Sequence, residues 1–389
     1  MRREMENIIK TETEYVFGRR VVSSRDCIDL SDEIYQRTRT QVNPNTLRRF
    51  FGLVKAPYSP SQSTLTILSK YCGFHSAEEV YHLKQKEIQG SRIEEKSLLY
   101  YFISLFQETP VSGNSDKTFL SLVKHTIRFL ESNLSLTDKL QGLIAKTVNG
   151  QSFYFEQFVN IDNLNSYYDD GLRYYLNEKR TSDAVLFVNA LKVFKYWLND
   201  NPGKVLEHGR LMLKNKRTGL SDLYIDSRFY AARLYYAHAA QESTEELLVD
   251  IYKLHSTSVE QFKNDISFFY FEYILAEALI LTGHYNDSLY YLEESQKRQN
   301  KTDSYKYIVS PENFKLLTAV AYYKMNFPGK SEQLFNDIKP SGFHSVSKKF
   351  SGIIYLSLAN QLKRKNLKYT ELIVSLIKET GFLRFQNGI

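Results

Sequence analysis

The chain has 389 residues, of which 42% are hydrophobic and 24% are charged, so it is long enough for two or more folded units and lacks the composition of a disordered chain. The net charge of +7 is small for this length, and the two cysteines, Cys27 and Cys72, cannot build a disulfide framework or a cysteine-based zinc site. The chain contains only 8 prolines and 17 glycines, which favours long helices over a β-sandwich or β-barrel with many tight turns. We therefore expect an all-α protein.

The first 20 residues are charged throughout and contain no apolar stretch of the kind that a signal peptide needs. No later segment is apolar over the length of a membrane span. These patterns predict a cytoplasmic protein without a membrane partner.

The first predicted helix follows Ser23 and Ser24, which can cap its start, and should end near Thr38. Its apolar positions Cys27, Leu30 and Ile34 recur at helical spacing. A short polar turn follows.

The second predicted helix runs from Asn43 to Val54, with Asn43 as N-cap and Pro44 as the first helical residue, where proline loses no hydrogen bond. Its apolar residues lie at i, i+3, i+4 and i+7, so one stripe should be buried and the polar residues between should face outward. The buried stripe comprises Leu47, Phe50, Phe51 and Val54, and the outward residues are Asn45, Thr46, Arg48 and Arg49.

The outward residues of this helix are the types that read DNA. Arginine pairs bidentately with guanine, asparagine with adenine, and threonine contacts a thymine methyl group or a phosphate. From Ile34 to Ala77 the sequence contains no Asp or Glu, which makes this stretch locally positive, although a solvated basic face without a partner would have the same composition. Flanking cations suit phosphate contacts. The predicted DNA-contacting residues are Asn43, Asn45, Thr46, Arg48, Arg49, Arg37, Arg39 and Lys55.

Two further short helices complete the predicted N-terminal head, residues 1–89. One should run from Ser63 to Tyr71, and a last one from Ser76 to Leu83. The first of these carries an apolar side that comprises Leu65, Leu68 and Cys72.

The stretch from Arg25 to Val80, with Asn-Pro-Asn-Thr-Leu-Arg-Arg (43–49) at its centre, resembles a helix-turn-helix of the phage-repressor (Cro/C1) type. The run Ser-Thr-Leu-Thr-Ile-Leu-Ser-Lys-Tyr (63–71) agrees with that family. Thr38 stands about where the family usually has glycine, and the linker to Asn43 is longer than the usual three-residue turn. The resemblance implies double-stranded DNA as the partner; a purely structural or protein-binding head is the alternative.

The remainder, residues 90–389, contains a repeat. Pro-Gly-Lys (202–204) recurs at 328–330, an offset of 126, which is three times 42. Polar breaks between and beyond these points give spacings of 41, 41, 43 and 40 residues, so each unit is predicted to be a helix, a short turn and a second helix. The pattern is clearest in 185–385, whereas 93–179 fits poorly and is read as a bridging portion. The equivalent turn positions are Asn201, Glu242, Gly283, Asn326 and Asn366.

The segment from Ala276 to Leu292 resembles a tetratricopeptide repeat, with a period longer than the usual ~34 residues. A small residue stands seven positions before the turn at Ala276, Ala319 and Ala359. The resemblance implies an α-solenoid whose concave groove takes a peptide or protein ligand. Tyrosines on the first helices are candidates for lining that groove, although core packing is the favoured interpretation. The tyrosines concerned are Tyr235, Tyr273 and Tyr322.

The sequence contains no phosphate-binding loop, no Gly-x-Ser-x-Gly elbow and no His-Glu-x-x-His helix, and its 8 histidines are dispersed. We therefore expect that the protein is not an enzyme and that it contains neither a cofactor nor a metal site. The expected function is a sequence-specific, homodimeric transcription regulator, whose repeat domain senses a ligand or mediates oligomerisation. This fusion resembles the peptide-sensing regulators of bacterial quorum systems. The alternative is a protein-interaction scaffold whose head does not bind DNA.

Overall fold

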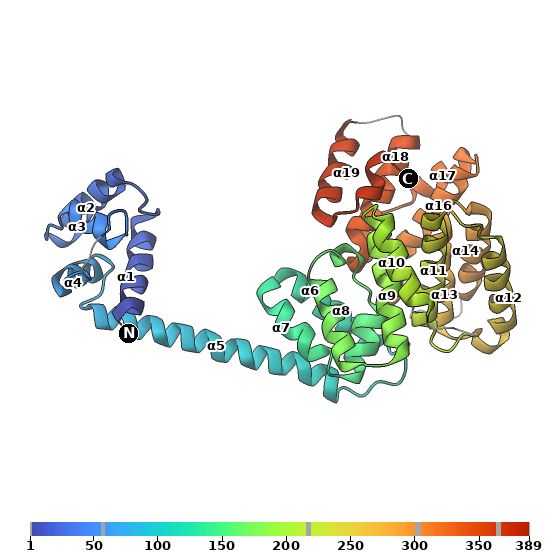
Figure 1. The fold of residues 1–389 in the computed structure, drawn as a ribbon, viewed down its shortest axis with the longest axis horizontal. Coiled ribbons are helices and arrows are strands. Elements are labelled where there is room, and N and C mark those ends of the chain that lie inside the picture. The colour runs from blue at the N-terminus through green and yellow to red at the C-terminus, as the bar shows by residue number, and fades with distance from the viewer. Residues whose placement is uncertain (1, 56–58, 215–218, 300–304, 363–366, 389) are drawn as a thin grey trace. The chain divides into compact units, whose positions relative to one another are not determined.

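The computed structural model describes residues 2–55, 59–214, 219–299, 305–362 and 367–388, and these are helical with no β-strand among them (Figure 1). The all-α prediction is therefore confirmed for this part of the chain. The chain divides into two compact units, residues 1–98 and 99–389. The division falls within one long helix, α5 (Ala77–Glu108), which also contains residue 89, where the sequence analysis placed its boundary. No helix in the described ranges has the length and apolar character needed to cross a membrane.

The first unit consists of α1 (Arg2–Phe17), α2 (Ser24–Thr38), α3 (Pro44–Phe50), α4 (Gln62–Tyr71) and the beginning of α5. Helix α1 packs on α4, and α2 packs on both α3 and α4. Sequence reasoning predicted α2, α3, α4 and the beginning of α5, but not α1. The core of this unit is made by side chains from every helix, among them Met5, Ile9, Leu30, Ile34, Leu47, Phe50, Leu68 and Val80.

The prediction that the last helix of the head ends at Leu83 was wrong, because α5 continues to Glu108. No proline occurs between Ala77 and Glu108, so nothing in the covalent backbone stops the helix earlier. The helix ends two residues before Pro110, whose ring disfavours helical backbone at the preceding residue.

The second unit begins with the end of α5 and continues through α6 to α8 before the first packed helix pair, α9 and α10. Its first elements are α6 (Lys117–Ser132), α7 (Leu134–Ile144), η1 (Gly150–Gln157), η2 (Ile161–Asn163) and α8 (Tyr167–Glu178). The next are α9 (Ser182–Leu198), α10 (Pro202–Leu213), α11 (Leu223–Ala240), α12 (Glu245–Phe262), α13 (Ile266–Leu281) and α14 (Tyr285–Gln299). The last are α15 (Tyr305–Ile308), α16 (Pro311–Lys324), α17 (Pro328–Asn336), η3 (Pro340–Gly342), η4 (Ser345–Ser347), α18 (Lys348–Leu362), α19 (Leu367–Thr380) and η5 (Leu383–Asn387).

Neighbouring helices of the second unit form packed pairs: α9 with α10, α13 with α14, α16 with α17, and α18 with α19. The first helices of these pairs, together with α11, also contact one another in the order α9, α11, α13, α16, α18. Asn201 caps α10, and Gly283 and Asn326 have positive φ angles of 91° and 63° in the turns before α14 and α17. Glu242 follows the end of α11, and Asn366 lies outside the described residues.

The segment 150–164, which contains η1 and η2, is almost completely buried inside the second unit. It contacts α6, α7, α8 and α11, and Phe155 and Phe158 are at most 1% exposed. Asp162 joins this segment to α18, because its carboxylate accepts the backbone N–H groups of Lys349 at 2.7 Å and Phe350 at 2.9 Å. Part of the stretch 93–179, which the sequence analysis read as a bridging portion, thus fills the interior between helices that are distant in the chain.

Candidate nucleic-acid interface

Local hydrogen bonds fix both ends of α2. The Ser23 side chain accepts a hydrogen bond from the N–H group of Asp26, and the Asp26 carboxylate accepts one from the N–H group of Ser23 at 2.8 Å. This reciprocal cap defines the start of α2. At the other end Arg39 has a left-handed backbone with φ of 54°, and its N–H donates to the Tyr35 carbonyl at 2.9 Å. The helix therefore begins and ends where the sequence predicts. Arg39, rather than a glycine, makes the left-handed turn out of the helix.

Helix α3 starts as predicted, because Pro44 is its first residue and the Asn43 side chain accepts the N–H of Asn45 at 2.8 Å. The prediction that it extends to Val54 was wrong, since α3 ends at Phe50. Gly52 has a φ of +79°, a conformation that glycine adopts freely and that terminates helices.

The early end of α3 changes the predicted buried stripe. Leu47 and Phe50 are buried as expected, whereas Phe51 is half-buried and Val54 is 49% exposed. Val54 lies beyond the last helical turn, so helical spacing no longer decides which way its side chain points.

Of the four predicted reading residues, Asn45 and Arg49 are exposed, and Thr46 and Arg48 are half-buried. Arg48 Nη1 donates to Asn45 Oδ1 at 2.9 Å, and Arg48 Nε is buried without a hydrogen-bond partner. The structure thus brings Asn45 and Arg48 together on one side of α3. Arg49 stands free of this pair on the same helix.

The three flanking cations differ in their surroundings. Arg37 forms an ion pair with Glu33 at 3.2 Å and lies 5.2 Å from the centre of the Tyr71 ring. Arg39 and Lys55 are exposed, and in the described part of the chain they make no ion pair. Arg39 and Lys55 are therefore available to a phosphate at no cost, whereas Arg37 would have to leave Glu33.

One basic residue near α3 was missed. Lys10, on α1, lies 5.5 Å from the centre of the Phe50 ring, the last residue of α3. The apolar positions Met5 and Ile9 and the buried Thr13 recur at intervals of four, a helical spacing that could have predicted α1.

Both cysteines of the first unit are free thiols. Burial raises the pKa of Cys27, an effect that the nearby Arg48 partly opposes. Burial also raises the pKa of Cys72, to about 11, although a contact with the Thr13 hydroxyl at 3.7 Å acts in the opposite direction. Both groups are therefore protonated and poor nucleophiles at neutral pH.

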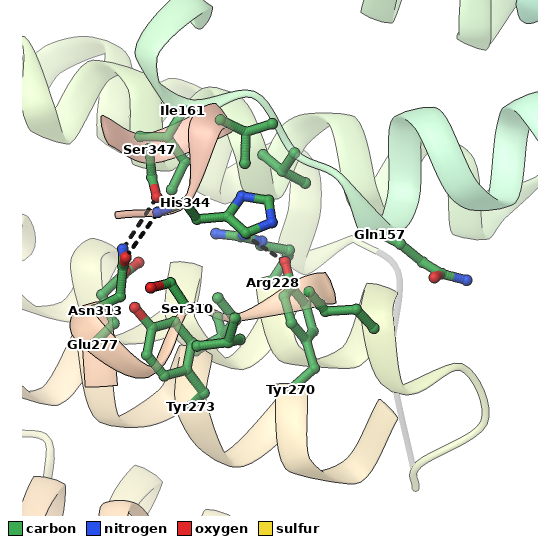
Figure 2. A pocket seen from close by; sticks show the side chains of 15 residues that line it. Gln157, Ile161, Arg228, Tyr270, Tyr273, Glu277, Ser310, Asn313, His344 and Ser347 are labelled. Carbon is green, nitrogen blue, oxygen red and sulfur yellow. Dashed lines mark hydrogen bonds between the residues drawn. The ribbon is translucent and has the colours of Figure 1, made fainter. Parts of the chain in front are cut away.

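The three tyrosines proposed for a ligand groove do not line one common space. Tyr235 is buried in the core, stacked on Phe194 at 5.1 Å between ring centres and packed on Trp197 at 4.8 Å. Tyr273 is buried too and lines a small internal cavity (Figure 2). Tyr322 is half-buried. Core packing therefore accounts for Tyr235. Tyr273 also packs in the core, and part of its side chain lines the cavity.

No protein-family model, no curated protein and no solved structure matches the chain.

Proposed function

We propose that the first unit binds double-stranded DNA, with α2 and α3 as a helix-turn-helix, and that the protein is a transcription regulator. The observation that carries the proposal is a set of exposed basic side chains in segment 34–77, which contains α3 and has no Asp or Glu. Arg39, Arg49 and Lys55 are exposed there without an internal ion pair in the described residues, while Leu47 and Phe50 anchor the helix. Such a surface supplies both phosphate contacts and side chains for base edges.

The shortness of α3 limits what can reach the major groove. In helix-turn-helix proteins the N-terminal residues of the second helix contact base edges. Asn45 and Thr46 lie in the first turn of α3, and Arg49 follows one turn later. We assign base reading to Arg49 and Asn45, with Arg48 holding Asn45 in place, and phosphate contacts to Arg39 and Lys55.

Binding of the full-length chain to DNA selected from a random pool would test the proposal. Affinity should fall steeply with salt, because phosphate contacts release counterions. Arg49→Ala should lower specific affinity by about 1 to 3 kcal/mol, the value of one bidentate arginine–guanine contact. Arg173→Ala is a matched control, since this exposed arginine on α8 is paired with Asp170 and its loss changes the net charge equally. Binding that does not depend on salt, or equal effects of both variants, would exclude the proposed interface.

For the second unit we propose an array of tetratricopeptide-like helical hairpins that mediates homodimerisation. The packed helix pairs and the contacts among their first helices support the array. Segment 150–164 fills the interior beside α11, which disfavours a peptide groove there. Light scattering after size-exclusion chromatography should show a dimer at micromolar concentration. A monomer at all concentrations would rule out this role and leave the protein-interaction scaffold as the better proposal for the second unit.

A further inference from the structure

A small cavity lies inside the second unit, between α11, α13 and the segments 308–313 and 344–347 (Figure 2). Its volume is about 30 Å³, which is room for one or two groups the size of a water molecule. Apolar side chains make up much of its wall, including Val159, Ile161, Ile274, Ile308 and Val346. Among them lie two groups that carry charge, Arg228 and Glu277.

Arg228 is only 5% exposed, and its guanidinium makes one hydrogen bond among the described residues. Nη2 donates to the Tyr270 hydroxyl at 2.6 Å, and Nε is buried without a partner. The guanidinium makes no ion pair with any carboxylate of the described residues, Glu277 included. A buried arginine charge is costly unless an anion or several acceptors compensate it. The cavity is therefore lined by a charged hydrogen-bond donor for which the described residues supply neither a counter-charge in contact nor an acceptor at Nε.

Glu277 compensates this charge incompletely. Both side chains line the cavity (Figure 2), but no hydrogen bond or ion pair joins them among the described residues. Burial raises the pKa of Glu277 to about 7, although Arg228 acts in the opposite direction. The carboxyl group is consequently protonated in a large fraction of molecules at neutral pH.

The surroundings of His344 add to the positive potential of the cavity. Burial lowers the pKa of His344 to about 4, and the positive charges of Lys124 and Arg128 contribute to the lowering. His344 Nε2 lies 2.8 Å from the Tyr307 carbonyl, so it carries the proton of the neutral ring. Nδ1 is then an acceptor, and it is buried without a partner.

We propose that the cavity binds one small monatomic anion, chloride, on the Arg228 guanidinium. The anion accepts a hydrogen bond from the unpartnered Nε–H group of Arg228. A water molecule beside it supplies a donor for His344 Nδ1. The volume of the cavity fits this pair and excludes an amino acid or a peptide end.

Anion-specific stabilisation of the full-length chain tests the site. At equal ionic strength and pH 7, the Tm should be roughly 2 to 4 °C higher in 100 mM chloride than in gluconate, which is too large for the cavity. Arg228→Met should abolish the difference. Arg233→Gln, on the same helix but outside the cavity, should retain it. Equal Tm values of the unmodified protein in the two salts would overturn the proposal.

Two further measurements do not depend on the folding of the Arg228 variant. Glu277→Gln removes the competing carboxylate and should increase the rise in Tm that chloride causes; a smaller rise would contradict the proposal.

A crystal grown in bromide should show an anomalous peak within hydrogen-bonding distance of Arg228. A cavity that contains only water under these conditions would exclude the anion site.

Discussion

At the scale of single residues, Arg39 combines an unfavourable backbone with an exposed charge. Its φ of 54° lies in the left-handed region, where a Cβ atom costs about 1 to 2 kcal/mol and glycine is the usual residue. The side chain makes no ion pair in the described part of the chain. Stability and the proposed DNA binding therefore place opposite demands on this position.

Arg39→Gly should raise the free energy of unfolding of the first unit by up to about 1 kcal/mol, because it removes the strain. The same substitution should weaken DNA binding and reduce its salt dependence, since one phosphate contact is lost. Hydrogen exchange of first-unit amides and DNA titrations at several salt concentrations measure the two effects. Gln241→Gly, at a second left-handed cap with φ of 56°, is the control that should change stability alone. Unchanged DNA affinity in Arg39→Gly would place Arg39 outside the interface.

Glu277 should make the stability of the second unit depend on pH. Burial raises its pKa from 4.5 to about 7, so the folded state binds the proton more tightly than the unfolded state. The resulting stabilisation is complete below pH 4.5 and is lost as the pH rises through 7. Its upper limit is about 3 kcal/mol.

Urea unfolding of Glu277→Gln at pH 5 and pH 8 should therefore show a smaller loss of stability with rising pH than the unmodified protein. His344 acts with the opposite sign, because burial lowers its pKa to about 4 and its contribution is lost as the pH falls below 6.5. Comparison of the two proteins at each pH cancels the contribution of His344. Identical pH dependence would show that Glu277 does not titrate in this range.

At the scale of elements, α3 depends on its cap, because seven residues make few hydrogen bonds of their own. The Asn43 side chain, which sequence reasoning assigned both to the N-cap and to DNA contact, accepts a hydrogen bond from the N–H group of Asn45. We therefore expect Asn43 to act on the proposed DNA binding through the order of α3.

Asn43→Ala should destabilise the first unit by about 1 kcal/mol and weaken DNA binding with it, whereas Asn43→Ser should preserve both, because serine caps helices equally well. Hydrogen exchange of the α3 amides and DNA affinity are the measurements. Loss of binding in Asn43→Ser with normal exchange would show that Asn43 contacts DNA directly.

At the scale of the whole molecule, contacts between distant parts of the chain hold the second unit together. Asp162 caps the start of α18 from a position 187 residues away, and Asn165 Nδ2 donates to the Thr380 carbonyl at 2.7 Å. Phe382 and Phe385, near the C-terminus, are buried, and η5 packs on α9. The two ends of the second unit are thus joined by hydrogen bonds and apolar contacts.

Asp162→Ala should destabilise the second unit by about 2 to 4 kcal/mol, because two backbone N–H groups, one of them in the buried residue Phe350, lose their acceptor. Thermal unfolding and faster amide exchange at Lys349 and Phe350 would report the loss. Asp170→Ala, at an exposed residue, is the control. Normal exchange at both amides would show that Asp162 does not hold α18.

Much of the fold could be predicted because its signals are local. Ser23 and Asn43 cap helices as expected, and Leu30, Ile34 and Leu47 are buried at helical spacing. For the candidate site, the sequence predicted the residues of α3 and its acid-free surroundings. It did not predict that Arg48 bonds to Asn45 or that Arg37 pairs with Glu33, because rotamers depend on neighbours that only the folded unit supplies.

The amino-acid sequence by itself determined the helical class, the caps at Ser23 and Asn43 and the turns at Asn201, Gly283 and Asn326, since these depend on residues within a few positions of one another. Only the tertiary structure decided that segment 150–164 fills the interior, that Asp162 reaches α18 and that Arg228 is left in a cavity without a full partner. These features arise from contacts between residues far apart in the chain. Such contacts leave no periodicity or motif in any one stretch of sequence.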